Sequence, residues 1–174
     1  MPVIIHRIGD LSAHSRTGRW DPAAAIPRML RISLRVGRLP RLEGFRPAWQ
    51  SPDLIAETVK RSLLRDTDSC NVVDHRRPAT ATDWTNYLEV IAGLGICSGP
   101  FDDSVEKWGK LAEQVGRSTT TPPTPVGLLE ELKKLETCAS AGSYPAPTGA
   151  GRSRSEMTDE VRAWFHAWTD GDDE

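Results

Sequence analysis

The chain has 174 residues, of which 26% are charged and 38% hydrophobic, and its net charge is −2. This length suits one domain or a small domain with tails. No apolar run approaches the ~18 residues of a membrane-spanning helix, so we expect no membrane partner. We also expect no secretory signal. Three widely spaced cysteines make a poor disulfide framework, which predicts a cytoplasmic protein in a reducing compartment.

Charge is distributed unevenly along the chain. Residues 1–50 contain nine arginines, no lysine and three acids, a net charge of +6, whereas residues 51–174 carry −8. One interpretation is that the two parts attract each other within the fold. The other is that the basic part binds an anionic partner.

The N-terminal third begins with a predicted strand over residues 2–8, because its β-branched side chains suit a pleated, half-buried surface. Residues 9–20 are small, polar and interrupted by glycine, and we expect a loop there. Residues 28–42 fit two patterns, since alternate residues are aliphatic while the arginines recur at helical spacing. The aliphatic residues do not gather on one helical stripe, so we favour a strand here.

The pattern from residue 51 onwards is helical. Capping residues and apolar residues at three- and four-residue spacing predict the starts and inner faces of these helices. We expect helices over residues 52–65, from Trp84 to Gly93 or Gly95, over 102–115, and from Thr124-Pro125 onwards, with residues 66–82 irregular.

The end of the chain predicts a tethered helix. Residues 139–152 are rich in Gly, Ala, Ser and Pro, a composition typical of a flexible linker. Ser153 and Glu156 have capping-box spacing and precede an aromatic stripe, after which the chain closes in acidic residues.

We therefore expect a mainly α fold, a small bundle of four to five amphipathic helices with an N-terminal basic region that is a strand, an arm or a short β-hairpin. The predicted segments are an Arg-rich arm or short β region (1–50), a helical core (51–138), a flexible linker (139–155) and a C-terminal amphipathic helix with an acidic tail (156–174).

Two groups of side chains are candidate binding residues. Arginine forks bind phosphates in a bidentate way, so nucleic acid or another anion is one hypothesis for the basic segment, and a solvated face is the alternative. The C-terminal aromatic residues predict docking into a groove, either on a partner or on the chain's own bundle. The anion-binding candidates are Arg28, Arg31, Arg35, Arg38 and Arg41, and the partner-binding candidates are Trp164, Phe165 and Trp168.

Patterns for catalysis and metal binding are weak. Gly93, Gly95 and Gly99 are spaced one residue too far for a dinucleotide-binding fingerprint. Cys70 and His75 lie close together but lack a second pair of zinc ligands. No serine lies in a nucleophile-elbow pattern. We predict no catalytic residue, no metal and no cofactor.

The sequence thus favours a non-enzymatic binding or adaptor protein that captures an anionic partner through its Arg-rich segment and docks through its aromatic helix. Its partner would be another protein, its own copies or nucleic acid. A viral or phage accessory or virion protein is one such role. The alternative is a structural subunit of a larger homo- or hetero-oligomeric assembly that does not bind nucleic acid. A salt-dependent affinity would distinguish the two.

Overall fold

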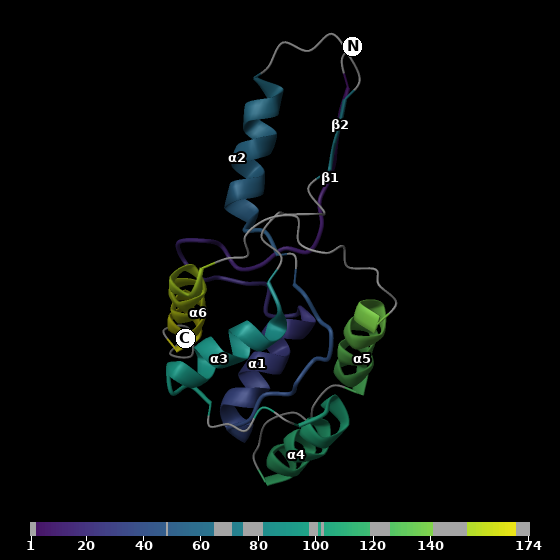
Figure 1. Ribbon diagram of the computed structural model, residues 1–174, viewed down its shortest axis with the longest axis vertical. Helices are drawn as coiled ribbons and strands as arrows, with labels where there is room; N and C mark the ends of the chain where they lie inside the picture. Colours follow the sequence, from purple (N-terminus) through teal and green to yellow (C-terminus); the bar gives the residue numbers. More distant parts are fainter. Residues whose placement is uncertain are drawn as a thin grey trace. The chain divides into compact units, whose positions relative to one another are not determined.

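The structure is a computed structural model that describes residues 3–47, 49–64, 71–74, 82–97, 101, 103–118, 126–140 and 153–169. These residues are mainly helical, as the sequence predicts (Figure 1). The elements are β1 (Ile4–Arg7), α1 (Ala25–Val36), α2 (Pro52–Leu63), β2 (Asn71–Asp74), α3 (Trp84–Gly93), α4 (Val105–Ser118), α5 (Val126–Ser140) and α6 (Arg154–Thr169).

The chain divides into two compact units that interleave along the sequence. Unit 1 comprises Met1–Trp20, Pro47–Thr82 and Ala146–Glu174, and unit 2 comprises Asp21–Arg46 and Asp83–Pro145. The four segments predicted from composition, with boundaries after residues 50, 138 and 155, stay a prediction.

The strands of unit 1 form a two-stranded parallel sheet, in which Ile5 lies opposite Val72 and His6 opposite Val73. The helix α2 lies between the two strands in the sequence, so unit 1 contains a β–α–β unit (Figure 1). The strand predicted near the N-terminus is confirmed. The hairpin is wrong, because the partner of β1 is a distant parallel strand, in a stretch that we expect to be irregular. Two adjacent valines in a polar stretch give too short a pattern to predict β2.

The Arg-rich stretch is a helix and not the strand that we favour from the sequence. Helix α1 buries Met29, Leu30 and Ser33 on one face, which is the spacing of a helix. The alternating aliphatic residues do not share an environment, since Leu34 is 37% exposed while Leu30 is 1% exposed.

Glycine 37 ends this helix. Its φ is +72°, and its N–H donates to the carbonyl oxygen of Ser33, which is how a left-handed residue closes a helix C-terminus. Helical arginine spacing followed by this glycine is the signal that could have identified α1 in the sequence.

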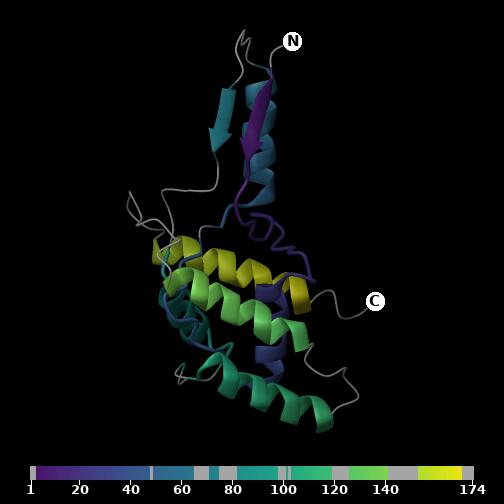
Figure 2. The same cartoon turned by 90° about the vertical axis from the view of Figure 1, so that its right-hand side faces the viewer.

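Three helices of unit 2 pack against one another. Helices α1, α4 and α5 contact one another in all three pairs (Figure 2). The stripes predicted for α3, α4 and α5 are buried in part, and Leu129 and Leu135 of α5 are partly exposed. The most deeply buried of these side chains are Trp84, Ile91, Val105, Trp108, Leu128 and Leu132.

Helix α6 belongs to unit 1 and has the predicted capping box. The Ser153 hydroxyl accepts from the backbone N–H of Glu156, while the Glu156 carboxylate accepts from the Ser153 backbone N–H. The predicted stripe of α6 is buried, from Met157 to Trp168. No described helix is long and apolar enough to cross a membrane.

Candidate functional site

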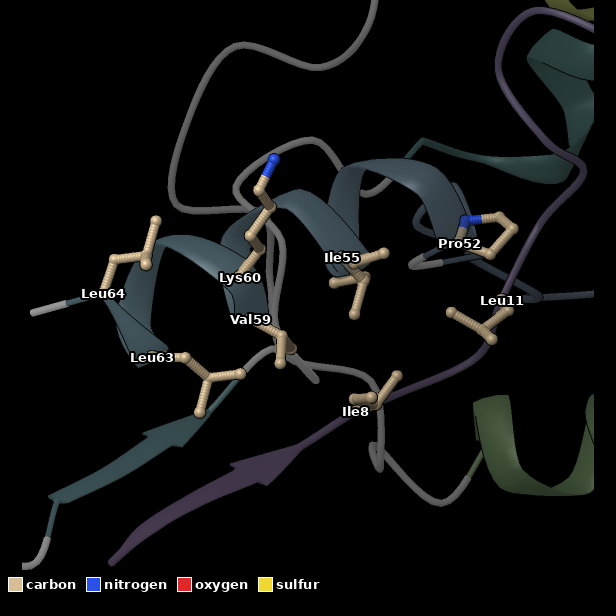
Figure 3. Close-up of a pocket in the computed structure, with 9 residues that line it drawn as sticks. Ile8, Leu11, Pro52, Ile55, Val59, Lys60, Leu63 and Leu64 are labelled. Atoms are coloured by element: carbon tan, nitrogen blue, oxygen red, sulfur yellow. The ribbon is translucent and has the colours of Figure 1, made fainter. Parts of the chain in front are cut away.

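An apolar groove of about 560 Å³ lies in unit 1, between α2 and the segment that follows β1 (Figure 3). Ile8 and Leu11 approach from that segment. Figure 3 shows that Ile55, Val59 and Leu63 point from α2 into the same space, while the amine of Lys60 points away from it. The residues of α2 and its C-terminal end that line the groove include Ile55, Val59, Lys60, Leu63 and Leu64.

The start of α2 is fixed by the loop after β1. Ser51 precedes Pro52, and Asp53 lies in the first turn, where a carboxylate favours the helix dipole. The backbone N–H of Ser15 donates to Asp53 at 3.0 Å, and its hydroxyl donates to the other carboxylate oxygen. Burial raises the pKa of Asp53, but these hydrogen bonds outweigh it and hold that pKa below its ordinary value. The loop is therefore held at one wall of the groove.

The far end of the groove is open to solvent. Leu63 is 71% exposed and Leu64 is 77% exposed, although both are large aliphatic side chains that would gain free energy from burial. The groove has one titratable side chain, Lys60, among its lining residues. This arrangement can bind apolar surface, and it contains no pair of groups for acid–base chemistry.

The sheet beside the groove has apolar side chains on both faces. His6 accepts from or donates to the Ser62 hydroxyl of α2 at 2.9 Å, so the face with His6 is the one towards α2. Side chains alternate along a strand, and Ile5 with its neighbour Val72 therefore lies on the opposite face. Those two side chains are 47% and 53% exposed. In the described part of the chain, β1 and β2 pair only with each other.

The structure separates the five predicted anion-binding arginines into two groups. Arg28 lies 3.5 Å from Glu131, and Arg38 lies 3.1 Å from Asp103. Both ion pairs join the basic stretch to acidic residues of unit 2. They are examples of the attraction within the fold that is one interpretation of the uneven charge distribution. The remaining three, Arg31, Arg35 and Arg41, have exposed side chains. Whether any of the five binds an anion stays a prediction.

Asp103 is a buried carboxylate with two partly exposed cationic partners in unit 2. Its side chain is inaccessible to solvent, and both Arg38 and Lys107 lie within ion-pair distance of it. The lysine and then the arginine hold the pKa of Asp103 below its ordinary value, against the opposing effect of burial. The indole N–H of Trp108 donates to both Ser33 and the Arg38 carbonyl. Arg38 thus joins the segment after α1 to the segment before α4, and the Trp108–Ser33 hydrogen bond joins the two helices themselves.

The predicted partner-binding residues are buried within their own chain. Trp164 is 0% exposed, and Phe165 and Trp168 are 8% and 5% exposed. The Trp164 ring lies 5.0 Å from that of Trp20 and 5.7 Å from that of Trp49. Docking on a partner would require these rings to leave that cluster, and it stays a prediction.

No metal-binding group of three or more His, Cys, Asp or Glu side chains occurs within the described ranges. Cys70 and His75 lie outside those ranges. Cys97 is buried, and burial raises the pKa of its thiol, which makes it a poor nucleophile.

Sequence reasoning missed the apolar groove altogether. Ile8 and Leu11 occur at the end of a strand and in a predicted loop, and they have no periodic pattern around them. The signal that could have found the groove is the stripe of Ile55, Val59 and Leu63 at four-residue spacing, which runs from a buried residue to one that is 71% exposed.

Comparison with known proteins gives distant, partial similarities to fungal enzymes. An adenylate-forming reductase of Aspergillus terreus is 24% identical over 164 residues, which are 92% of this chain. A glycine betaine reductase of Emericella nidulans is 26% identical over 110 residues, 62% of the chain. A non-reducing polyketide synthase of the same fungus is 31% identical over 106 residues, 59% of the chain.

The matched regions are small parts of those proteins. The chain spans 15% of the adenylate-forming reductase, 9% of the glycine betaine reductase and 4% of the polyketide synthase. No family model matches the chain. No solved structure matches it either.

Proposed function

We propose that this chain forms part of a larger reductase, to which it contributes two strands of an α/β sheet and a helical unit. Two of the three relatives are named reductases, and the match to the adenylate-forming reductase extends over 92% of this chain. The third relative is a polyketide synthase, also an enzyme. These similarities count against the prediction of a non-enzymatic protein.

The observation that carries the proposal is the parallel pair of strands in unit 1. Parallel sheets occur almost only where both faces are covered, and a two-stranded sheet is marginally stable in water. Here apolar side chains emerge from both faces, and Ile5 and Val72 on the face away from α2 are about half exposed. Further strands and a covering layer, supplied by the rest of the reductase, would complete this sheet.

The side chains in the described ranges indicate which role this chain has in the reductase and which role falls to other segments. Reduction by hydride transfer needs a cofactor such as a nicotinamide nucleotide or a flavin. The groove and sheet described above offer apolar surface and no acid–base pair. We therefore assign this chain a structural and substrate-side role in the reductase, with the hydride donor held by other segments.

The test replaces the matched region of the Aspergillus terreus adenylate-forming reductase with this chain. Adenylate formation is followed by ATP–pyrophosphate exchange, and reduction by the near-ultraviolet absorbance of NADPH or NADH. We expect the exchange to persist both in the chimera and in a deletion of the matched region. Reduction should be lost in the deletion and restored in the chimera.

A matched variant connects the test to the sheet. In the chimera, Ile5→Lys with Val72→Lys should abolish reduction, because a charge on that face prevents a covering layer from packing. Leu54→Lys, on an exposed position of α2 outside the groove lining, is the control and should leave reduction unchanged. A deletion that still reduces its substrate at the parent's rate would overturn the proposal. So would a folded chimera that retains exchange without reduction.

A binding or adaptor role is the second candidate. The exposed side chains of Arg31, Arg35 and Arg41 favour it, and salt-sensitive binding of an oligonucleotide would support it. The alternative of a structural subunit in a larger assembly shares with the main proposal the need for a neighbour on unit 1. Light scattering across a concentration series separates that alternative, because self-assembly changes the mass of the chain alone.

The helix bundle and the cellular location that the sequence predicts are also proposals. We propose that unit 2 is a bundle of four helices, in which α3 joins the mutually contacting α1, α4 and α5. The support for including α3 is that its side chains Trp84, Tyr87 and Ile91 are buried. We propose a cytoplasmic location, for which the support is the buried free thiol of Cys97.

A further inference from the structure

A second cavity in unit 1, of about 530 Å³, is rich in positive charge. It lies between the loop after β1 and helix α6. Arg16 and Arg19 line it from the loop, and Arg162 and His166 line it from the helix. The remaining lining residues are a threonine and two alanines, so no carboxylate lines this cavity.

The loop that carries two of these arginines is held tightly. Gly18 has a φ of +64° and donates its N–H to the carbonyl oxygen of His14. A Cβ atom at Gly18 would lie 1.9 Å from the carbonyl oxygen of Ala163. The backbone of the loop therefore lies directly against α6, with Arg16 and Arg19 on either side of the contact in the sequence.

A cluster of three aromatic rings, Trp20, Trp49 and Trp164, fixes the C-terminal end of the same loop. Trp20 follows Arg19, and its indole lies 5.0 Å from Trp164 on α6 and 5.0 Å from Trp49. Its indole N–H also donates to the Leu11 carbonyl. Because the loop is anchored between the two arginines by Gly18 and after them by Trp20, the four cationic or donor side chains are brought together without a partner molecule.

Among the described residues, the three arginines of this cavity are poorly compensated by carboxylates. Arg162 lies 3.8 Å from Asp159 in an exposed pair, which is worth little in water. Within the described residues, no carboxylate lies within ion-pair distance of Arg16 or Arg19. Three like charges around one cavity repel one another, and an anion relieves that repulsion.

We propose that this cavity binds a small molecule through a phosphate group. Guanidinium groups match phosphate oxygens with paired hydrogen bonds, and three of them suit a multiply charged anion better than a single carboxylate. The cavity falls within the range of small-molecule pockets, roughly 300–1,000 Å³, so it has room for an organic part beside the phosphate. This site is independent of the reductase proposal, because it rests on the lining residues alone.

The test measures binding of pyrophosphate to the full chain by isothermal titration at low ionic strength. In the double variant Arg16→Gln with Arg19→Gln, the dissociation constant should rise at least about tenfold, since charge-assisted hydrogen bonds are lost. Arg162→Gln should weaken binding in the same direction. Inorganic phosphate should bind more weakly than pyrophosphate, and acetate more weakly still.

A matched control removes the same charge elsewhere. Arg35→Gln with Arg41→Gln removes two exposed arginines of unit 2, and it should leave the dissociation constant within about twofold, because these charges lie outside the cavity. The far-ultraviolet circular dichroism of each variant confirms that it folds. Arg16→Lys with Arg19→Lys keeps the charge but loses the fork, and it should give an intermediate affinity.

Three outcomes would overturn the proposal. One is the absence of pyrophosphate binding to the folded wild-type chain. Another is an equal loss of affinity in the two double-glutamine variants, which would indicate diffuse attraction by the basic third of the chain. The last is an oligonucleotide that displaces pyrophosphate and depends on Arg35 and Arg41, which would identify a nucleic-acid surface.

Discussion

The two units differ in how far their apolar side chains are buried. Unit 2 buries almost all of them, and Leu34 is its one large hydrophobic residue among those found exposed in the described ranges. Unit 1 buries the aromatic stripe of α6 but exposes aliphatic residues on β1, on β2 and on both sides of α2. These exposed residues of unit 1 are Val3, Ile5, Ile8, Leu11, Leu54, Leu63, Leu64 and Val72.

This difference indicates which part of the chain is complete by itself. Three mutually contacting helices can satisfy their inner faces within unit 2. A β–α–β unit cannot do so, because its sheet has two faces and two edges and its single helix covers one face. Unit 1 is therefore the unit whose exposed apolar surface needs a neighbouring segment to cover it.

The largest expected effect tests the core of unit 2 against the surface of unit 1. Leu132→Asp should unfold unit 2, at a cost above about 4 kcal/mol, because it buries an unpaired charge. Ile91→Asp should do the same. Leu63→Asp, on a side chain that is 71% exposed, should leave the thermal midpoint almost unchanged. Equal loss of stability in Leu132→Asp and Leu63→Asp would contradict the comparison.

The aromatic cluster shows that part of unit 1 has a true core. Trp164→Ala should lower the free energy of unfolding by about 3–5 kcal/mol, since it leaves a large cavity between Trp20 and Trp49. Denaturant unfolding followed by tryptophan fluorescence measures this change. Trp164→Phe should recover much of the loss. A Trp164→Ala variant as stable as the wild type would show that the cluster does not hold α6 in place.

Two glycines with similar backbone angles sharpen the comparison further. Gly18→Ala should cost about 3 kcal/mol or more, because its methyl group collides with the Ala163 backbone and its φ is positive. Gly37→Ala has the same kind of φ but nothing within 4 Å of its Cβ, so it should cost about 1 kcal/mol. Chemical denaturation of both variants measures the difference, and equal costs would mean that the loop does not lie against α6.

The smallest effect concerns pH and the ion pairs of unit 2. The folded-state pKa of Asp103 is lowered, so its contribution is fully present above the unfolded-state pKa and is lost as the pH falls through the folded-state value. Asp103→Asn should cost about 2 kcal/mol at neutral pH, and the difference from wild type should vanish in strong acid.

An exposed carboxylate provides the control for this pH dependence. Glu106 lies 2.9 Å from Lys133, and both side chains are at least half exposed. Its pKa is lowered chiefly by the hydrogen bond from that lysine, yet Glu106→Gln should leave the unfolding midpoint unchanged, since solvent screens exposed pairs. Denaturation curves at several pH values measure both variants. If Asp103→Asn lowered the free energy of unfolding equally at every pH, the stabilising role assigned to the ionised Asp103 carboxylate would be wrong.

The sequence by itself determined most of the helices. Capping residues and apolar stripes locate α2, α3, α4, α5 and α6, because local hydrogen bonding and a 3.6-residue period are written in neighbouring residues. The same local logic predicts β1 from Val3, Ile4 and Ile5. It failed for α1, where an alternation of aliphatic residues competed with helical spacing of arginines, and burial of Met29, Leu30 and Ser33 decided for the helix.

Only the tertiary structure decided what these elements meet. The pairing of β1 with β2 joins residues more than sixty positions apart, and no local pattern encodes such a contact. Likewise, the pairing of Arg38 with Asp103, the groove beside α2 and the cluster of Arg16, Arg19 and Arg162 each depend on distant segments. Helices are local in sequence, whereas sheets, ion pairs and cavities are set by how the chain returns on itself.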